Sequence, residues 1–149
     1  MPEPDRIQPK KLGDYLEIMT KAVFQSGISW KVVESKWPGI KGAFRDFDAE
    51  AVAETSEQAL DDLCQDTRVI RNRRKLSAIV SNAQRMVELD EEHGGFQKYL
   101  RSHDDFTATV PDIRKQFKFM GDTGIYFFLY VLGEDVPPHD EWFASRKSK

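Results

Sequence analysis

The sequence predicts an all-α fold, built as one compact domain of many short helices. Apolar residues recur at three- and four-residue spacing in several segments, and no segment shows the alternating pattern of a half-buried strand. With 149 residues, of which 40% are hydrophobic and 32% charged, the chain is long enough to bury a core without a metal or a disulfide. We therefore expect residues 1–149 to form a single domain, with residues 1–9 as a poorly ordered N-terminal arm.

The first half of the chain contains several helix signals in succession. A regular apolar face predicts a first helix that ends at about Phe24. Ser29 is expected to cap a short helix that Trp-Pro-Gly at 37–39 ends, and the apolar spacing of residues 40–47 predicts another helix. Thr55, with a glutamine three residues later, forms a capping-box pattern and predicts the next helix start.

The second half contains the best-defined amphipathic pattern. Its apolar face predicts a long helix from about residue 72 to residue 90, which His-Gly-Gly at 93–95 ends. A short helix is expected over residues 96–100. Thr-Val-Pro-Asp at 109–112 then predicts the start of a further helix.

The most informative segment is a glycine-containing turn that runs into an almost wholly apolar helix at 125–132. Such a turn leaves the first backbone N–H groups without partners inside the helix and directs the positive end of the helix dipole outward, which favours phosphate binding. The apolar helix must be buried, so it holds the turn rigidly at the surface. The candidate DNA-binding residues of this turn are Met120, Gly121, Thr123 and Gly124. An ordinary turn between two helices is the alternative.

A carboxylate follows the apolar helix at Asp140. A carboxylate placed after the far end of this buried helix can face whatever the turn has bound. We therefore take Asp140 as the candidate catalytic residue. The run Pro-Pro-His-Asp-Glu-Trp at 137–142 is also a good helix entry, in which Asp140 would act only as the cap.

Two further groups of residues have features of a nucleic-acid site. Phe24, Gln25 and Trp30 place two aromatic rings beside a glutamine, a combination that suits a pocket for an extruded base, although packing of both rings in the core is the alternative. A basic run could form one DNA-binding face although the net charge is −3, or it could be a solvated helix start. Its candidate residues are Arg71, Arg73, Arg74 and Lys75.

Other classes of protein are disfavoured by composition. No apolar run approaches the roughly 18 residues of a membrane-spanning helix, and the N-terminus has no secretory-signal pattern, so we expect a cytoplasmic protein. The single cysteine, Cys64, excludes an internal disulfide, and three histidines make a zinc site improbable. We expect no metal and no cofactor.

Several segments, in their order and spacing, carry a resemblance to a known family. They are residues 24–30, 44–48, 65–75, 82–83 and 117–121. From about Tyr15 to Trp142 the chain resembles the DNA-3-methyladenine glycosylase I family, within the helix-hairpin-helix DNA glycosylases. The resemblance implies a helix-hairpin-helix fold and a monofunctional enzyme of base excision repair, which flips an alkylated purine out of double-stranded DNA and hydrolyses its bond to the sugar. The hairpin's backbone amides would grip the strand, and Trp30 would stack on the extruded base.

The chain also departs from the pattern of this family. Ala22 stands where the family usually has a pocket glutamate, and Phe119 stands where broader superfamily members often have the first glycine of the hairpin. The family's N-terminal segment, with a pocket tyrosine and zinc-binding residues, has no counterpart in residues 1–14, and the C-terminal zinc ligands are missing too. Asp140 lies nineteen positions after Gly121, close to where the endonuclease III-like members keep a catalytic aspartate.

Our leading hypothesis is therefore a monomeric DNA glycosylase for alkylated purines such as 3-methyladenine, lacking the zinc site of its family. The alternative is a non-catalytic DNA-binding relative that keeps the hairpin but not the base-specificity glutamate. A helical interaction module with no nucleic-acid role is a third reading, because the isoelectric point is about 5.7.

Overall fold

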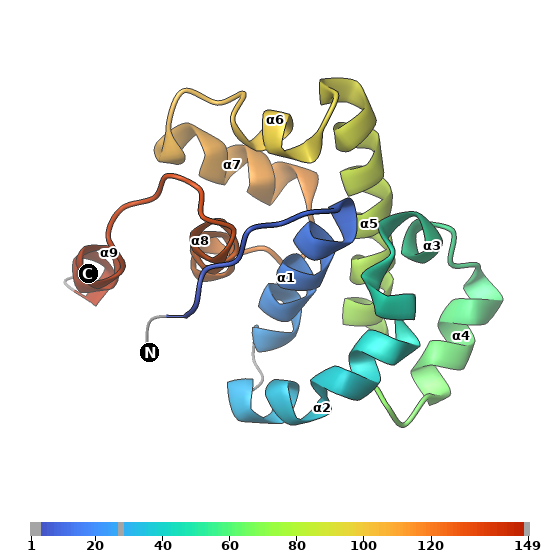
Figure 1. Cartoon of the computed structure of the whole chain (residues 1–149). Coiled ribbons are helices and arrows are strands. Elements are labelled where there is room, and N and C mark those ends of the chain that lie inside the picture. The colour runs from blue at the N-terminus through green and yellow to red at the C-terminus, as the bar shows by residue number, and fades with distance from the viewer. Residues whose placement is uncertain (1–3, 27–28, 148–149) are drawn as a thin grey trace.

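A computed structural model describes residues 4–26 and 29–147 of the chain (Figure 1). Within these ranges the secondary structure is entirely helical, which confirms the predicted all-α class. The elements are α1 (Leu12–Gln25), α2 (Trp30–Ala43), the 3-10 turn η1 (Arg45–Phe47), α3 (Ala49–Ala53), α4 (Glu57–Gln65), α5 (Arg73–His93), α6 (Phe96–Leu100), α7 (Phe106–Gln116), α8 (Asp122–Val131) and α9 (His139–Lys147). Among the described helices, none has both the length and the apolar character needed to cross a bilayer.

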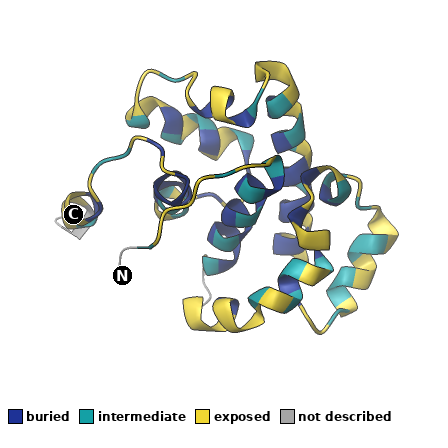
Figure 2. Cartoon of the chain, in the orientation of Figure 1, coloured by how far each residue is buried: buried dark blue, intermediate teal, exposed yellow. Residues whose placement is uncertain are grey.

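Helix α1 lies at the centre of the molecule, with α5 packed on one side and α8 on the other (Figure 1). Figure 2 shows α8 and the inner faces of α1 and α5 mainly as buried, whereas α2 and α4 expose much of their surface. The amphipathic pattern of α1 and α5 explains their position, because each helix turns its apolar face inward. The largely apolar α8 must instead be covered on several sides.

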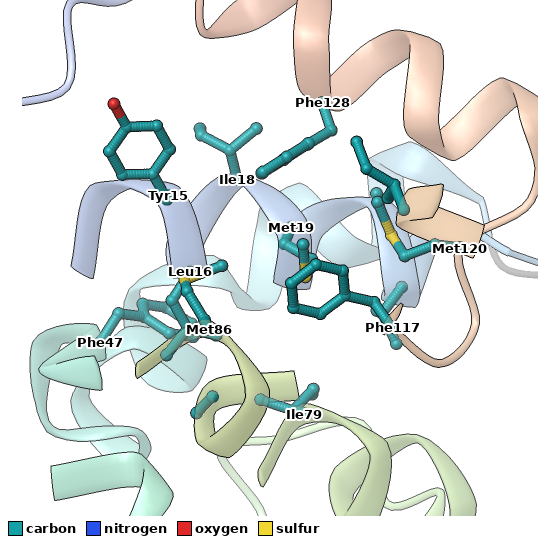
Figure 3. Close-up of a cluster of buried hydrophobic side chains, with 14 of the residues drawn as sticks. Tyr15, Leu16, Ile18, Met19, Phe47, Ile79, Met86, Phe117, Met120 and Phe128 are labelled. Atoms are coloured by element: carbon teal, nitrogen blue, oxygen red, sulfur yellow. The ribbon is translucent and has the colours of Figure 1, made fainter. Parts of the chain in front are cut away.

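The core joins α1, α5 and α8 through large apolar side chains. Leu16 and Met19 from α1, Ile79 and Met86 from α5, and Phe128 from α8 have no exposed surface. In Figure 3 these side chains point toward one another between the three helices. Burial of such groups at about 25 cal/mol per Å² is the main term that stabilises this arrangement.

Two helices continue through prolines that were expected to mark helix boundaries. Helix α2 contains Pro38, so the predicted stop at 37–39 is wrong. The Trp37 indole N–H donates to Glu17 of α1 at 2.9 Å, and this tertiary contact supports the segment although proline removes one helical hydrogen bond. Helix α7 contains Pro111 and starts at Phe106, earlier than predicted, because the Asp105 carboxylate caps it at the amide of Ala108.

Two smaller observations concern a helix cap and the N-terminal segment. Ser56, not Thr55, caps α4 by accepting from the amide of Ala59 at 3.1 Å. Residues 4–10 have no regular secondary structure, and the Ile7 amide donates to the carbonyl of Val131 at 2.7 Å. This tertiary hydrogen bond ties Ile7 to the end of α8, and the poorly ordered arm expected for residues 1–9 stays a prediction.

A polar network fixes α7, the helix that leads into the predicted hairpin. The Asp112 carboxylate accepts from the Tyr99 hydroxyl at 2.7 Å, lies 2.9 Å from Nε2 of His103, and accepts from the Gln116 amide at 3.2 Å. The Gln116 oxygen in turn accepts from Arg85 of α5 at 2.7 Å. Burial alone would raise the pKa of Asp112, but these hydrogen bonds outweigh it and hold the pKa below its usual range.

This network makes acid stability depend on Asp112. Because the folded-state pKa lies below the unfolded one, the carboxylate stabilises the fold above the unfolded pKa of about 3.9, and the contribution is lost as the pH falls through the folded-state pKa. Asp112→Asn should lower the free energy of unfolding at pH 7 and flatten its fall below about pH 5. Denaturant titrations across pH test this, with the exposed Asp104→Asn as control. An unchanged pH profile in Asp112→Asn would contradict the assignment.

Candidate nucleic-acid interface

The hairpin between α7 and α8 turns at Phe119, not at a glycine. Phe119 has a φ of 58°, in the left-handed region that favours glycine, whereas Gly121 has an ordinary φ of −85° and occupies the N-cap of α8. The expected glycine turn is therefore wrong in detail. A non-glycine residue in this region costs on the order of 1–3 kcal/mol, so surrounding contacts must hold it there.

Asn82 supplies such a contact from α5. Its Oδ1 accepts from the Lys118 backbone N–H at 2.8 Å, and its Nδ2 donates to the Lys118 carbonyl at 3.1 Å. The Asn82 side chain therefore pairs with the backbone as a neighbouring strand would. Asn82 is buried, so these bonds are shielded from water and fix the hairpin to the core.

The start of α8 faces outward. Gly121 and Thr123 are exposed, and a Cβ added at Gly121 would meet no atom within 4 Å. Gly121 also has no side chain that could accept hydrogen bonds from the first amides of the helix, so an outside acceptor can approach them. Met120 differs from its neighbours because its side chain is buried in the core (Figure 3). Its predicted DNA contact is thus limited to the backbone.

A cavity of about 350 Å³ lies between the end of α1 and the start of α8. It is lined by Ala22, Gln25, Ser26, Phe119, Gly121, Asp122, Thr123 and Gly124. The small residues Ala22 and Gly124 face each other here, since a Cβ on Gly124 would lie 3.5 Å from that of Ala22. A larger hollow of about 490 Å³ beside Arg45 and Asp46 is lined by residues outside the hairpin.

The predicted base-pocket residues do not all reach this cavity. Gln25 lines it, whereas Phe24 is fully buried in the core, as the alternative reading of this corner expected. Trp30 is 37% exposed on the first turn of α2 and is absent from the described lining, with Lys21 Nζ 6.0 Å from its ring centre. Residues 27–28 of the same motif lie outside the described residues.

The side chains of the basic run differ in their exposure and in their contacts with other residues. Arg71 and Arg74 are exposed, and the Arg74 guanidinium lies 5.9 Å from the Phe119 ring centre, which joins the start of α5 to the hairpin. Arg73 is also exposed but pairs with Asp61 at 2.6 Å.

Lys75 is 5% exposed and donates to the Ser26 carbonyl at the end of α1, and burial lowers its pKa. The prediction of a phosphate contact at Lys75 is therefore corrected, because this ammonium group satisfies a helix end inside the protein.

Asp140 lies apart from the cavity lining. It is the second residue of α9, so it is not the cap that the alternative reading expected, and its side chain is fully exposed. Nδ1 of the buried His139 lies 3.4 Å from its carboxylate. Helix α9 packs on α8 through Trp142, whose ring stacks on Tyr126 at 4.2 Å, and Figure 1 shows α8 between α1 and α9. The catalytic role of Asp140 stays a prediction.

Sequence reasoning missed three residues that line the cavity, Ser26, Phe119 and Asp122. The Asp122 carboxylate forms an ion pair with Arg114 of α7. Asp122 could have been predicted to lie at the start of α8, because acidic residues are favoured in the first turn of a helix. Between described residues there is no group of three or more His, Cys, Asp or Glu side chains that could hold a metal ion.

Comparison with known proteins gives a consistent result. The sequence model of the methyladenine glycosylase family matches residues 10–116. The DNA-3-methyladenine glycosylase of Haemophilus influenzae is 28% identical, with a match that covers 73% of this chain and 70% of that protein, and DNA-3-methyladenine glycosylase 1 of Escherichia coli K12 is 27% identical with the same coverage. The solved 3-methyladenine DNA glycosylase I of Staphylococcus aureus superposes with a TM-score of 0.75 at 26% identity, over 90% of this chain and 83% of that one.

The contact between Asn82 and the hairpin gives a direct stability test. Asn82→Ala leaves the N–H and C=O of Lys118 without these partners, so we expect it to lower the free energy of unfolding by about 2–4 kcal/mol. Gln84→Ala on the same helix removes an exposed amide-to-carbonyl bond and should cost about 1 kcal/mol or less. Denaturant unfolding measures both changes, and equal costs would show that Asn82 has no special role.

Proposed function

The chain belongs to the methyladenine glycosylase family, and we propose that it is a DNA glycosylase that hydrolyses the bond between an alkylated purine and its deoxyribose. Its relatives are named DNA-3-methyladenine glycosylases, and the reaction is the first step of base excision repair. The observation that carries the proposal is a cavity directly beside an outward-facing hairpin, within a fold shared with these enzymes.

The hairpin and Arg74 supply the grip on double-stranded DNA. Backbone amides at a helix N-terminus bind phosphate through both hydrogen bonds and the helix dipole. Arg74, held over the Phe119 ring, adds a charge at the edge of the hairpin. Contacts of this kind fix the position of the strand without reading its sequence.

The cavity receives the base once it has left the helix. A flipped nucleotide must find a pocket that offers stacking and hydrogen bonds to its edge. The Phe119 ring provides an aromatic wall, and the Gln25 amide offers a donor and an acceptor. With the base in the cavity, the sugar stays outside it, between the hairpin and solvent.

We propose that Asp140, which lies outside the cavity lining, carries out the chemical step on the sugar. Its side chain is fully exposed, and Nδ1 of His139 lies 3.4 Å from its carboxylate. Such a carboxylate can orient or deprotonate water and stabilise the oxocarbenium-like sugar.

One competing reading remains as an outcome of the tests. A non-catalytic DNA-binding relative would bind duplex DNA without releasing any base, and the family match over residues 10–116 favours the enzyme over this reading. We further propose that the protein acts in the cytoplasm as a monomer.

Release of 3-methyladenine from methylated duplex DNA tests the proposed reaction. We expect the wild-type protein to release the base faster than it leaves spontaneously, and Asp140→Asn to reduce the enzymatic rate about 100-fold or more. Glu141→Gln is the matched control, because it removes the adjacent exposed carboxylate of the same helix turn. An unchanged rate in Asp140→Asn, with loss in Asp122→Asn, would move the role to the cavity carboxylate.

The salt dependence of duplex binding tests the role of Arg74. Each phosphate that a protein neutralises adds about 0.9 to the slope of log K against log salt concentration, so Arg74→Gln should reduce the slope by about 1. Arg68→Gln is the matched control, because Arg68 lies just before the basic run and forms an ion pair with Asp66 at 2.7 Å. Equal slopes for Arg74→Gln and the wild type, measured by fluorescence anisotropy, would exclude the contact.

A further inference from the structure

We propose that Arg114 masks the negative charge of Asp122, so that the start of α8 can accept a phosphate of the DNA strand. Arg114 is then a positioning residue of the DNA contact, because it acts through Asp122 and not on the phosphate itself. This inference rests on the proposed glycosylase function and concerns how the hairpin holds the strand, not which base is removed.

Asp122 places a carboxylate where the hairpin is proposed to bind a phosphate. It is the first residue of α8 and directly follows Gly121, the N-cap. The amides of residues 122–124 precede the first hydrogen bond inside the helix, which Ile125 donates to the Gly121 carbonyl at 2.8 Å. A carboxylate in the first turn is attracted by the same helix dipole that would bind a phosphate. Asp122 is therefore an internal competitor of the strand.

Arg114 holds this competitor from the last turn of α7. Its guanidinium forms an ion pair with the Asp122 carboxylate across the hairpin. Because the opposite charge is adjacent, a phosphate that approaches Gly121 meets a nearly neutral pair instead of a full negative charge. Without Arg114, we expect the carboxylate to move toward the positive end of its own helix, where it would oppose the strand directly.

The exposure of the ion pair argues against a purely structural role. The Arg114 side chain is 50% exposed and the Asp122 side chain is 37% exposed. Ion pairs with such exposed partners contribute little to stability, because water and salt screen them. The buried Asn82 instead fixes the hairpin, through hydrogen bonds to both the N–H and the carbonyl of Lys118. The main effect of the pair is therefore on the charge of the surface.

The other charges of the hairpin give this masking its effect on binding. Within residues 114–124, Asp122 is the single acidic residue. The side chains of Lys115 and Lys118 are exposed, and the Arg74 guanidinium lies beside the hairpin. Affinity for DNA depends on positive charge gathered near the phosphates. With Asp122 masked, this turn presents cations and backbone amides to the strand.

A double-mutant cycle tests the masking, with affinity for an undamaged duplex measured by fluorescence anisotropy at low salt. Arg114→Gln uncovers the acid and should weaken binding about tenfold. In the Asp122→Asn background there is no acid to uncover, so the same Arg114→Gln change should weaken binding by less than about threefold. A direct contact between Arg114 and a phosphate would instead give equal losses in the two backgrounds.

Lys115→Gln is the matched control, because it removes an exposed cation from the neighbouring position on α7 without uncovering an acid. Its loss of affinity should stay below about threefold. Arg114→Lys keeps the positive charge beside Asp122 and should recover most of the affinity that Arg114→Gln loses. Denaturant unfolding of the Arg114→Gln protein should show nearly wild-type stability, and a large loss of stability would support a structural role instead.

Equal losses from Arg114→Gln in the two backgrounds, or a loss no larger than that of Lys115→Gln, would overturn the masking. Release of 3-methyladenine by the wild-type protein is measured in parallel. If the base is released while the cycle gives either of these results, the proposed function stands and the role of Arg114 fails alone. A wild-type protein that neither binds the duplex nor releases the base would overturn both.

Discussion

The burial of helix α8 is the constraint on which the other features of the site depend. Six of its ten residues are buried, and it packs against α1 on one side and against Trp142 of α9 on another. A helix covered in this way cannot shift without exposing large aromatic groups to water, which would be costly. Its N-terminus is consequently held in one place, with Gly124 against Ala22 of α1 and Gly121 at the surface.

The hairpin and the cavity are two results of the same packing. Asn82 pairs with the Lys118 backbone from α5 and so holds Phe119 in a backbone conformation that glycine would adopt more easily. Phe119 lines the cavity, and its ring lies next to the Arg74 guanidinium. The unfavourable backbone conformation of Phe119 therefore places an aromatic ring beside the start of α8. Rigid elements on both sides suit a site that must place a flipped base accurately.

The sequence predicted what depends on local pattern, but not what depends on tertiary contacts. The all-α class and the exposure of the hairpin followed from apolar spacing and from the apolar character of the helix behind it. Pro38 was misjudged because helix continuity there is supported by a hydrogen bond from Trp37 to another helix. A basic run likewise cannot show which cation turns inward, and Lys75 does. Neither the pairing of Asp122 nor the distance of Asp140 from the cavity has any signature in the spacing of residues.

Amide chemical shifts during titration with duplex DNA test the central claim, that the start of α8 meets the strand. With an uncleavable damaged-base analogue in the duplex, we expect the largest changes at residues 121–124, with smaller changes at Gln25 beside the cavity. The contact between Asn82 and Lys118 should keep the rest of the hairpin in its free conformation. Changes confined to surfaces away from the hairpin, with residues 121–124 unaffected at saturation, would contradict the account.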